Sequence, residues 1–223
     1  MSARVGVVLG GCGFLDGTEI QEAVSILIAL DRRGAKVVCA APNVGQASTI
    51  NHLTRKGETL QRRVLDESAR IARGKVMDLT GLHAEDLDAL LFPGGFGAAK
   101  NLCTFAEEGA ECRVNDQVER IVTDMHRAGK PIGMACIAPV IAARVLGKLG
   151  KKPKVTIGTD AATAAAIVAM KAQHQNTGPA DICVDESNRL VTTPCYMNNV
   201  GPWIVYQGAE KMVEEVLRMA GFR

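Results

Sequence analysis

The chain reads Lys130-Pro131-Ile132-Gly133-Met134-Ala135-Cys136-Ile137-Ala138-Pro139 and continues as Val140-Ile141-Ala142-Ala143-Arg144-Val145-Leu146. The first part is an apolar run of the length of a buried strand, and it ends at Cys136. Apolar residues at helical spacing begin immediately afterwards. The stretch therefore predicts a sharp strand-to-helix corner with Cys136 at its tip.

A side chain at such a corner lies near the first free N–H groups of the helix. These donors and the helix dipole favour negative charge, so we expect the Cys136 thiol to tend towards the nucleophilic thiolate. This is the nucleophile-elbow arrangement with cysteine in place of serine. The alternative is a small apolar cysteine packed under a helix, because free cysteines are among the most buried residue types.

Strand-like and helix-like patterns alternate on both sides of this stretch. Besides the strand that ends at Cys136, strands are expected at residues 4–9, 36–41, 76–79, 88–92 and 154–157, and a β-hairpin at 182–185 and 189–193. Besides the helix that follows Cys136, helices are expected at 19–33, 64–73, 114–127, 160–172 and 203–220, the first with Thr18 as N-cap and Gly34 as its stop. The alternation predicts one α/β domain over residues 1–223, with a mainly parallel sheet covered by helices on both faces and a C-terminal β-hairpin.

The composition argues against several classes of function. A net charge of +2, with 4% aromatic residues and no basic tract, gives nucleic acid little to bind. No apolar run reaches the length of a membrane span, and the charged start of a signal peptide is missing. The seven cysteines are widely spaced and none is at zinc-ligand spacing, so neither a disulfide framework nor a metal site is expected. We expect a cytoplasmic protein, or an organellar one after removal of a targeting segment.

Three segments leave the predicted strands at the carboxyl edge of the sheet, where open α/β folds bind ligands. They are residues 10–17, 93–97 and 135–138. In the second segment, Gly94 and Phe96 are candidates for a substrate pocket, because the two glycines let the backbone approach a ligand closely. If this loop lies beside Cys136, the N–H groups of Gly95 and Ile137 form an oxyanion hole, in which losing one donor costs ~3–4 kcal/mol. An ordinary tight turn is the alternative.

The glycine-rich segment 10–17 does not have the spacing of a dinucleotide-binding loop. The second predicted strand also ends without the acid that would hold a ribose hydroxyl, so no nucleotide cofactor is expected. The loop is instead expected to shape a small pocket, with Cys12 as a second exposed thiol.

Two acids, Glu19 and Glu22, lie in the first turns of the following helix, about one turn apart on one face. Such acids are commonly surface residues that the helix dipole favours. Here, however, the helix begins beside the proposed nucleophile. A carboxyl group whose pKa is raised by burial could donate a hydrogen bond to the sulfur and later carry a proton.

The histidines are weaker candidates for a catalytic role. None follows Cys136 directly, and none occurs after His174. A cysteine–histidine pair of the hydrolase or glutaminase type therefore has weak support in the sequence.

Six stretches, spread in order over nearly the whole chain, match the pattern of one known family. They are Gly11-Cys12-Gly13 with Asp16-Gly17-Thr18-Glu19-Ile20, Ile50-Asn51-His52-Leu53-Thr54, Pro93-Gly94-Gly95-Phe96-Gly97-Ala98-Ala99-Lys100-Asn101-Leu102, Cys136-Ile137-Ala138-Pro139, Thr156-Ile157-Gly158-Thr159-Asp160, and Val191-Thr192-Thr193-Pro194 with Tyr196-Met197. The chain resembles the ElbB family, also called isoprenoid biosynthesis proteins with an amidotransferase-like domain or sigma cross-reacting proteins. This family is part of the superfamily of class I glutamine amidotransferases, PfpI-type proteases and the Parkinson-associated deglycase.

The resemblance implies a flavodoxin-like three-layer α/β sandwich, a homodimer, and Cys136 as the elbow nucleophile. It also implies a weak, cofactor-independent glyoxalase activity that turns glyoxal into glycolate. Glu22 matches the family's thiolate-facing glutamate, with Glu19 as the alternative. Ile137 stands where the PfpI proteases have histidine, which argues against proteolysis. Met134 is bulkier than the small residue usual two places before an elbow nucleophile, which weakens an amidotransferase assignment.

We therefore predict a cofactor-independent, metal-free enzyme that acts on glyoxal or a similar small aldehyde. Cys136, Glu22, Gly95 and Ile137 are its predicted catalytic residues, and Glu19, Cys12, Gly94 and Phe96 its predicted pocket residues. One alternative is a redox or electrophile sensor, or an interaction protein, that uses the same reactive cysteine. A further alternative is a glutamine amidotransferase-like subunit.

Overall fold

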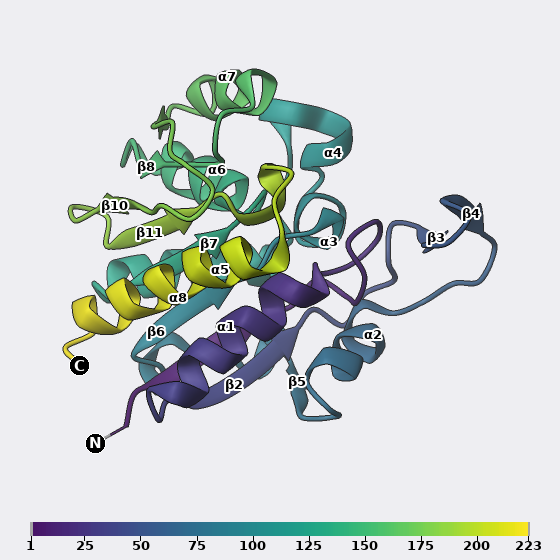
Figure 1. Cartoon of the computed structure of the whole chain (residues 1–223), viewed down its shortest axis with the longest axis horizontal. Coiled ribbons are helices and arrows are strands. Elements are labelled where there is room, and N and C mark those ends of the chain that lie inside the picture. The colour runs from purple at the N-terminus through teal and green to yellow at the C-terminus, as the bar shows by residue number, and fades with distance from the viewer. Residues whose placement is uncertain (1, 223) are drawn as a thin grey trace.

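A seven-stranded sheet lies at the centre of the computed structural model, which describes residues 2–222 (Figure 1). Its strand order is β10-β11-β7-β6-β1-β2-β5. The parallel strands are β1 (Arg4–Val8), β2 (Lys36–Ala41), β5 (Val76–Asp78), β6 (Ala89–Phe92), β7 (Ile132–Ala135) and β11 (Leu190–Thr193). The edge strand β10 (Cys183–Asp185) pairs with β11 in the antiparallel direction and forms the predicted C-terminal hairpin. Residues 1 and 223 of the predicted domain lie outside the described range.

Helices cover both faces of the sheet, as the alternation of strands and helices predicted. Figure 1 shows α1 (Ile20–Arg32) and α8 (Pro202–Met219) side by side on one face, and these two helices pack on each other. The strands alternate between the layers with the period of two that a pleated strand requires. In β6, Ala89 and Leu91 pack in the α1–α8 layer, whereas Leu90 and Phe92 pack with α5 (Asp116–Arg127) and α6 (Pro139–Lys148) on the other face. The three-layer, flavodoxin-like α/β class is thus confirmed.

The remaining elements are short. The chain also contains the helices α2 (Val64–Ile71), α3 (Phe96–Lys100), α4 (Phe105–Glu108) and α7 (Ala161–Ala169), and 3₁₀ turns at Leu79–Gly81, Ala84–Asp86, Gly109–Glu111 and Cys195–Met197. Two small ribbons lie outside the central sheet: β3 (Thr49–Asn51) with β4 (Lys56–Glu58), and β8 (Lys154–Val155) with β9 (Gln173–His174). The first of these projects from the body of the molecule as an arm (Figure 1).

Two predicted details of these elements are wrong. The first helix is capped by Glu19, whose carboxylate accepts the Glu22 N–H at 2.6 Å, because the predicted cap Thr18 is buried and accepts the Gly10 N–H instead. The predicted strand at 154–157 shortens to β8 and does not join the central sheet. Its next two N–H groups bind side chains instead of a strand: that of Thr156 donates to Thr192 Oγ1 and that of Ile157 to His174 Nε2.

The register of the central strands brings the predicted site together. Phe92 of β6 pairs with Met134 of β7, and Ala135 of β7 pairs with Thr193 of β11. The segments that leave these three strands therefore emerge side by side at the carboxyl edge, where ligands bind in this class of fold.

Candidate active site

Cys136 lies at the predicted corner, between the end of β7 and the start of α6. Its φ is +59°, in the left-handed region that residues other than glycine rarely adopt. The Cys136 N–H donates to the Thr193 carbonyl at 2.9 Å, which ties the corner to the neighbouring strand. Pro139 occupies the first turn of α6, where its fixed φ favours the helix. A strained backbone held in this way by its surroundings is typical of functional sites.

Gly94 provides the room for this corner. A Cβ atom at Gly94 would lie 2.4 Å from Cys136 Cβ and 2.8 Å from Glu22 Oε2. The bulk of Met134, by contrast, does not crowd the elbow, because Met134 points into the layer of α5 and α6 while Cys136 packs in the opposite layer. The small residue that the elbow needs is therefore supplied by the neighbouring loop and not by position 134.

The Glu22 side chain is fully buried beside the cysteine. Its Oε2 accepts the Gly94 N–H at 2.9 Å and its Oε1 accepts the Tyr196 N–H at 3.1 Å. A further hydrogen bond joins this carboxyl group to the Cys136 thiol. Loops after three different strands thus hold one acid against one thiol.

Burial raises the pKa of Glu22 to about 7, and the charge of nearby Glu19 adds to this effect. Burial also raises the pKa of the Cys136 thiol well above its ordinary value, with the Glu22 charge as the second cause and the Gly95 N–H acting against both. The prediction of an acidic Cys136 thiol is therefore wrong, because its pKa is raised and not lowered. Desolvation of the sulfur and the charge of Glu22 outweigh the effect of the helix N-terminus on this pKa.

Two backbone N–H groups, those of Gly95 and Ile137, belong to residues that line the cavity next to Cys136. The Gly95 N–H is hydrogen-bonded to the Cys136 sulfur. Gly95 itself has φ +88°, and a Cβ atom there would lie 2.3 Å from the Glu19 nitrogen, so only glycine fits. Among residues 2–222 the Ile137 N–H has no hydrogen-bond acceptor, and Ile137 lines the same cavity. This pair of amides has the character of an oxyanion hole.

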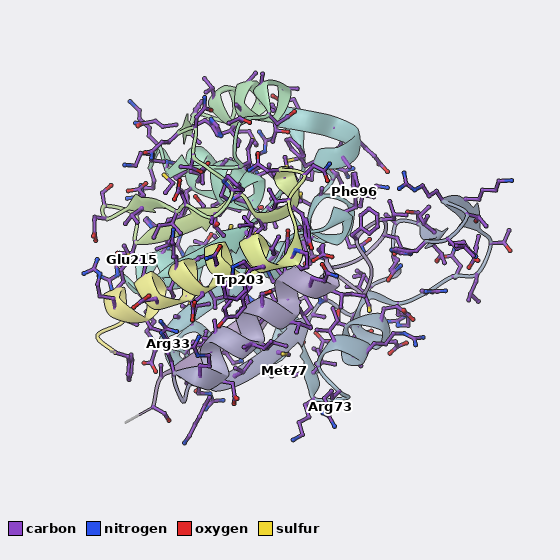
Figure 2. The ribbon with its side chains drawn as sticks, viewed as in Figure 1. Arg33, Arg73, Met77, Phe96, Trp203 and Glu215 are labelled. Carbon is purple, nitrogen blue, oxygen red and sulfur yellow. The ribbon has the colours of Figure 1, made fainter. Side chains whose placement is uncertain are left out.

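Cys136 opens onto a cavity of about 520 Å³ with mainly apolar walls. The cysteine is 7% exposed, so a small molecule in the cavity can reach it. Figure 2 shows the Phe96 ring projecting beside α3, where it forms part of the wall. The other lining residues are Phe14, Glu19, Gly95, Ala99, Phe105, Ala106, Ile137, Asp160, Thr163, Tyr196 and Met197.

The structure brings some predicted pocket residues to this cavity and not others. Glu19 and Phe96 line it, and Gly94 lies behind the Cys136–Glu22 pair. Cys12 does not line it. Cys12 is half-buried beside Glu67 and Arg70 of α2, and burial raises the pKa of its thiol. The loop 10–17 contributes Phe14 instead, and the prediction of Cys12 as a pocket residue is wrong.

Sequence reasoning missed the far wall of the cavity. Phe105 and Ala106 come from the short helix α4, and Asp160 and Thr163 from the start of α7. Within residues 2–222 no histidine lines the cavity, and His174 is engaged with the Ile157 N–H. The described residues hold no cluster of three or more side chains suited to a metal ion. None of the helices in this range is both long and apolar enough to cross a membrane.

No family model matches the chain, but individual relatives do. It is 47% identical, over 99% of its length and 84% of the relative's, to the human protein named glutamine amidotransferase-like class 1 domain-containing protein 3, mitochondrial. The zebrafish protein named ES1 protein, mitochondrial, is 35% identical over 98% of this chain and 86% of its own. A solved structure, an isoprenoid biosynthesis protein with amidotransferase-like domain from Ehrlichia chaffeensis, superposes with a TM-score of 0.90 at 34% identity over 96% of this chain and 99% of that one.

The chain belongs to the ES1 and ElbB-like family. The resemblance drawn from the sequence is thus confirmed at the level of the family. More distant structures share only the fold. Drosophila melanogaster DJ-1beta, for example, superposes on this ElbB-like chain with a TM-score of 0.51 at 19% identity, covering 99% of this chain and 97% of that one. The human relative and the Ehrlichia structure are both named for an amidotransferase-like domain.

Proposed function

We propose that the protein is a cofactor-independent glyoxalase-type enzyme that converts glyoxal or a related 2-oxoaldehyde to the 2-hydroxy acid. The observation that carries this proposal is the Cys136–Glu22 pair at the base of an apolar cavity. A carboxyl group with a pKa of about 7 both accepts and returns a proton near neutral pH. A thiol that is protonated at rest then needs this base at the moment of attack.

In the first step the Cys136 sulfur adds to one aldehyde carbon while Glu22 takes the thiol proton. The C=O bond opens to an oxyanion, which the Gly95 and Ile137 N–H groups stabilise until Glu22 returns the thiol proton to it and the hemithioacetal forms. Removing one such donor typically costs ~3–4 kcal/mol of transition-state stabilisation.

In the second step Glu22 carries the proton from the sulfur-bearing carbon to the neighbouring carbon, which converts the hemithioacetal into the thioester of the hydroxy acid. Water then cleaves the thioester, releasing glycolate and the Cys136 thiol. The sequence adds one water to one glyoxal, with no net oxidation and no cofactor. Covalent attachment to sulfur divides one difficult rearrangement into easier steps.

A histidine-dependent amidotransferase is less well supported, because the hydrogen bonds to the Cys136 side chain come from Glu22 and Gly95 and not from an imidazole. A passive electrophile sensor would gain most from an acidic thiol, whereas burial and Glu22 raise the pKa of Cys136.

The test is multiple-turnover kinetics with glyoxal in excess. We expect glycolate to accumulate far beyond the enzyme concentration, and we expect Cys136→Ala to abolish this while the protein stays folded. Cys12→Ala is the matched control, since this thiol lies outside the cavity, and it should retain the wild-type rate. A single burst of aldehyde loss equal to the enzyme concentration would instead show a stoichiometric sensor.

Two further expectations complete the proposal. The resemblance implies a homodimer, which light scattering of the purified protein tests directly. The human and zebrafish relatives are named as mitochondrial proteins, and this supports an organellar location over the cytoplasm. Fractionation of the cells that produce the protein tests the location.

A further inference from the structure

A pair of cysteines, Cys103 and Cys112, lies at the base of the loop that contributes Phe105 and Ala106 to the cavity wall. Cys103 and Val114 form an antiparallel bridge, and next to it the Thr104 N–H donates to the Arg113 carbonyl at 2.9 Å. Cys112 lies two residues before Val114, on the same side of this short ribbon. The Cys103 thiol donates to the Ala98 carbonyl at 3.2 Å, and the Cys112 thiol lies near enough to influence its pKa.

The surroundings prepare Cys112 to react first. The Arg144 guanidinium binds the carbonyl oxygens of Ala110 at 2.9 Å and Glu111 at 3.3 Å, directly before this cysteine. The neighbouring Cys103 thiol and the positive charge of Arg144 both lower the pKa of the Cys112 thiol. A thiol of this kind is the usual first target of a hydroperoxide.

The segment between the two cysteines can open to admit such a reagent. Both thiols are buried in one core cluster. The intervening helix α4 and 3₁₀ turn Gly109–Glu111 contain no buried residue. Only Phe105 and Ala110 of this segment pack against the core, so its opening exposes little apolar surface, as expected for a region that unfolds locally.

We propose that Cys103 and Cys112 are a redox-active pair that a hydroperoxide converts to a disulfide, which fixes the cavity wall carried by residues 104–111. The Cys112 thiolate attacks the peroxide oxygen, giving a sulfenic acid and one molecule of water or alcohol. The Cys103 sulfur then displaces the sulfenic hydroxyl, which leaves as water with the Cys103 proton. The two thiols supply the two electrons that reduce the peroxide.

The consequence for the site follows from Phe105 and Ala106, which lie inside the closed loop and line the cavity at Cys136. The disulfide restricts how far these side chains can move away from Cys136. We expect oxidation to restrict the entry of bulky reagents to Cys136. This modification site does not depend on the reaction proposed for Cys136.

Peptide mapping tests the pair directly, because residues 101–113 form one tryptic peptide that contains both cysteines and no other. The full-length Cys136→Ala variant is treated with hydrogen peroxide, alkylated with iodoacetamide and digested. We expect this peptide to lose two hydrogens and to take up no iodoacetamide, and dithiothreitol should restore two alkylation sites. Two alkylated thiols after peroxide, or cross-links between chains at these cysteines, would overturn the proposal.

The effect on the cavity is read from N-ethylmaleimide labelling of Cys136 in the protein with its native cysteine. Peroxide should slow the labelling several-fold, and dithiothreitol should restore it. In Cys112→Ser, which cannot form the disulfide, the labelling rate should not change. An equal loss in Cys112→Ser would show that peroxide acts on Cys136 itself and that the loop disulfide does not gate the cavity.

Discussion

At the scale of single residues, the site depends on how one proton is shared between Cys136 and Glu22. The corner that exposes the cysteine is predictable, because a short apolar run followed by helical spacing forces a turn at Cys136. The protonation state is not predictable from the same stretch. It depends on burial and on the N–H groups of Gly94 and Tyr196, which come from loops 42 and 60 residues away along the chain.

Glu22→Gln should lower kcat for glyoxal by about 10²–10⁴-fold, the usual contribution of a positioned acid or base. The variant should also ionise Cys136 at lower pH, because the charge of Glu22 is one cause of the raised thiol pKa. Measuring the iodoacetamide labelling rate against pH checks this shift. Glu19→Gln is the control, and an effect of Glu19→Gln as large as that of Glu22→Gln would transfer the proton-carrying role to Glu19.

The raised pKa of Glu22 also predicts how stability depends on pH. Its value rises from an ordinary 4.5 to about 7 on folding, so the folded state favours the protonated acid. The stabilisation is complete below about pH 4.5 and is lost as the pH rises through 7. The free energy of unfolding should fall by about 3 kcal/mol over this range. Urea unfolding at pH 5 and pH 8 should show this loss in the wild type and not in Glu22→Gln. Equal pH slopes for the two proteins would contradict it.

At the scale of secondary-structure elements, long periodic segments were predictable and short ones were not. The spans of α1, β2 and α8 follow from apolar periodicity and from stops such as Gly34, which adopts φ +63° after the first helix. The elements β3, β4 and β9 have two or three residues each and are largely polar, so neither periodicity nor propensity distinguishes them from loops. Strand β8 left the central sheet because side chains satisfy the N–H groups that follow it.

The loop between β6 and α3 makes a prediction at this scale. Gly94→Ala would place a methyl group 2.4 Å from Cys136 Cβ, so the elbow and the loop must move apart. We expect a loss of about 1–3 kcal/mol of stability, typical of overpacking, together with loss of glyoxal turnover. Gly57→Ala, where a Cβ atom meets nothing within 4 Å, is the matched control. Urea titration and the turnover assay of both variants check this, and wild-type activity in Gly94→Ala would refute the account of the elbow.

At the scale of the whole molecule, the cavity is assembled from segments that stretch from Phe14 to Met197. The parallel topology explains why the loops after β1, β6, β7 and β11 meet, and this part follows from the sequence. The contributions of α4 and α7 do not, because these helices reach the sheet edge through tertiary packing and no local pattern marks them as cavity walls.

The walls predict which carbonyl compounds the protein accepts. Phe14, Phe96 and Phe105 give an apolar lining, and the charged groups in it are acids, Glu19 and Asp160. The pKa of Asp160 is lowered by hydrogen bonds with Thr163, so this carboxylate carries its negative charge near neutral pH. An uncharged 2-oxoaldehyde with an apolar body, such as phenylglyoxal, should therefore react with a higher kcat/KM than methylglyoxal, and the anionic 2-oxoaldehyde 4-carboxyphenylglyoxal should react least. Because the volume of about 520 Å³ exceeds the size of glyoxal, the aromatic ring gains contacts that a smaller aldehyde cannot make. Steady-state kinetics with the three compounds tests the order, and turnover of 4-carboxyphenylglyoxal equal to that of phenylglyoxal would show that the acidic groups do not select the substrate.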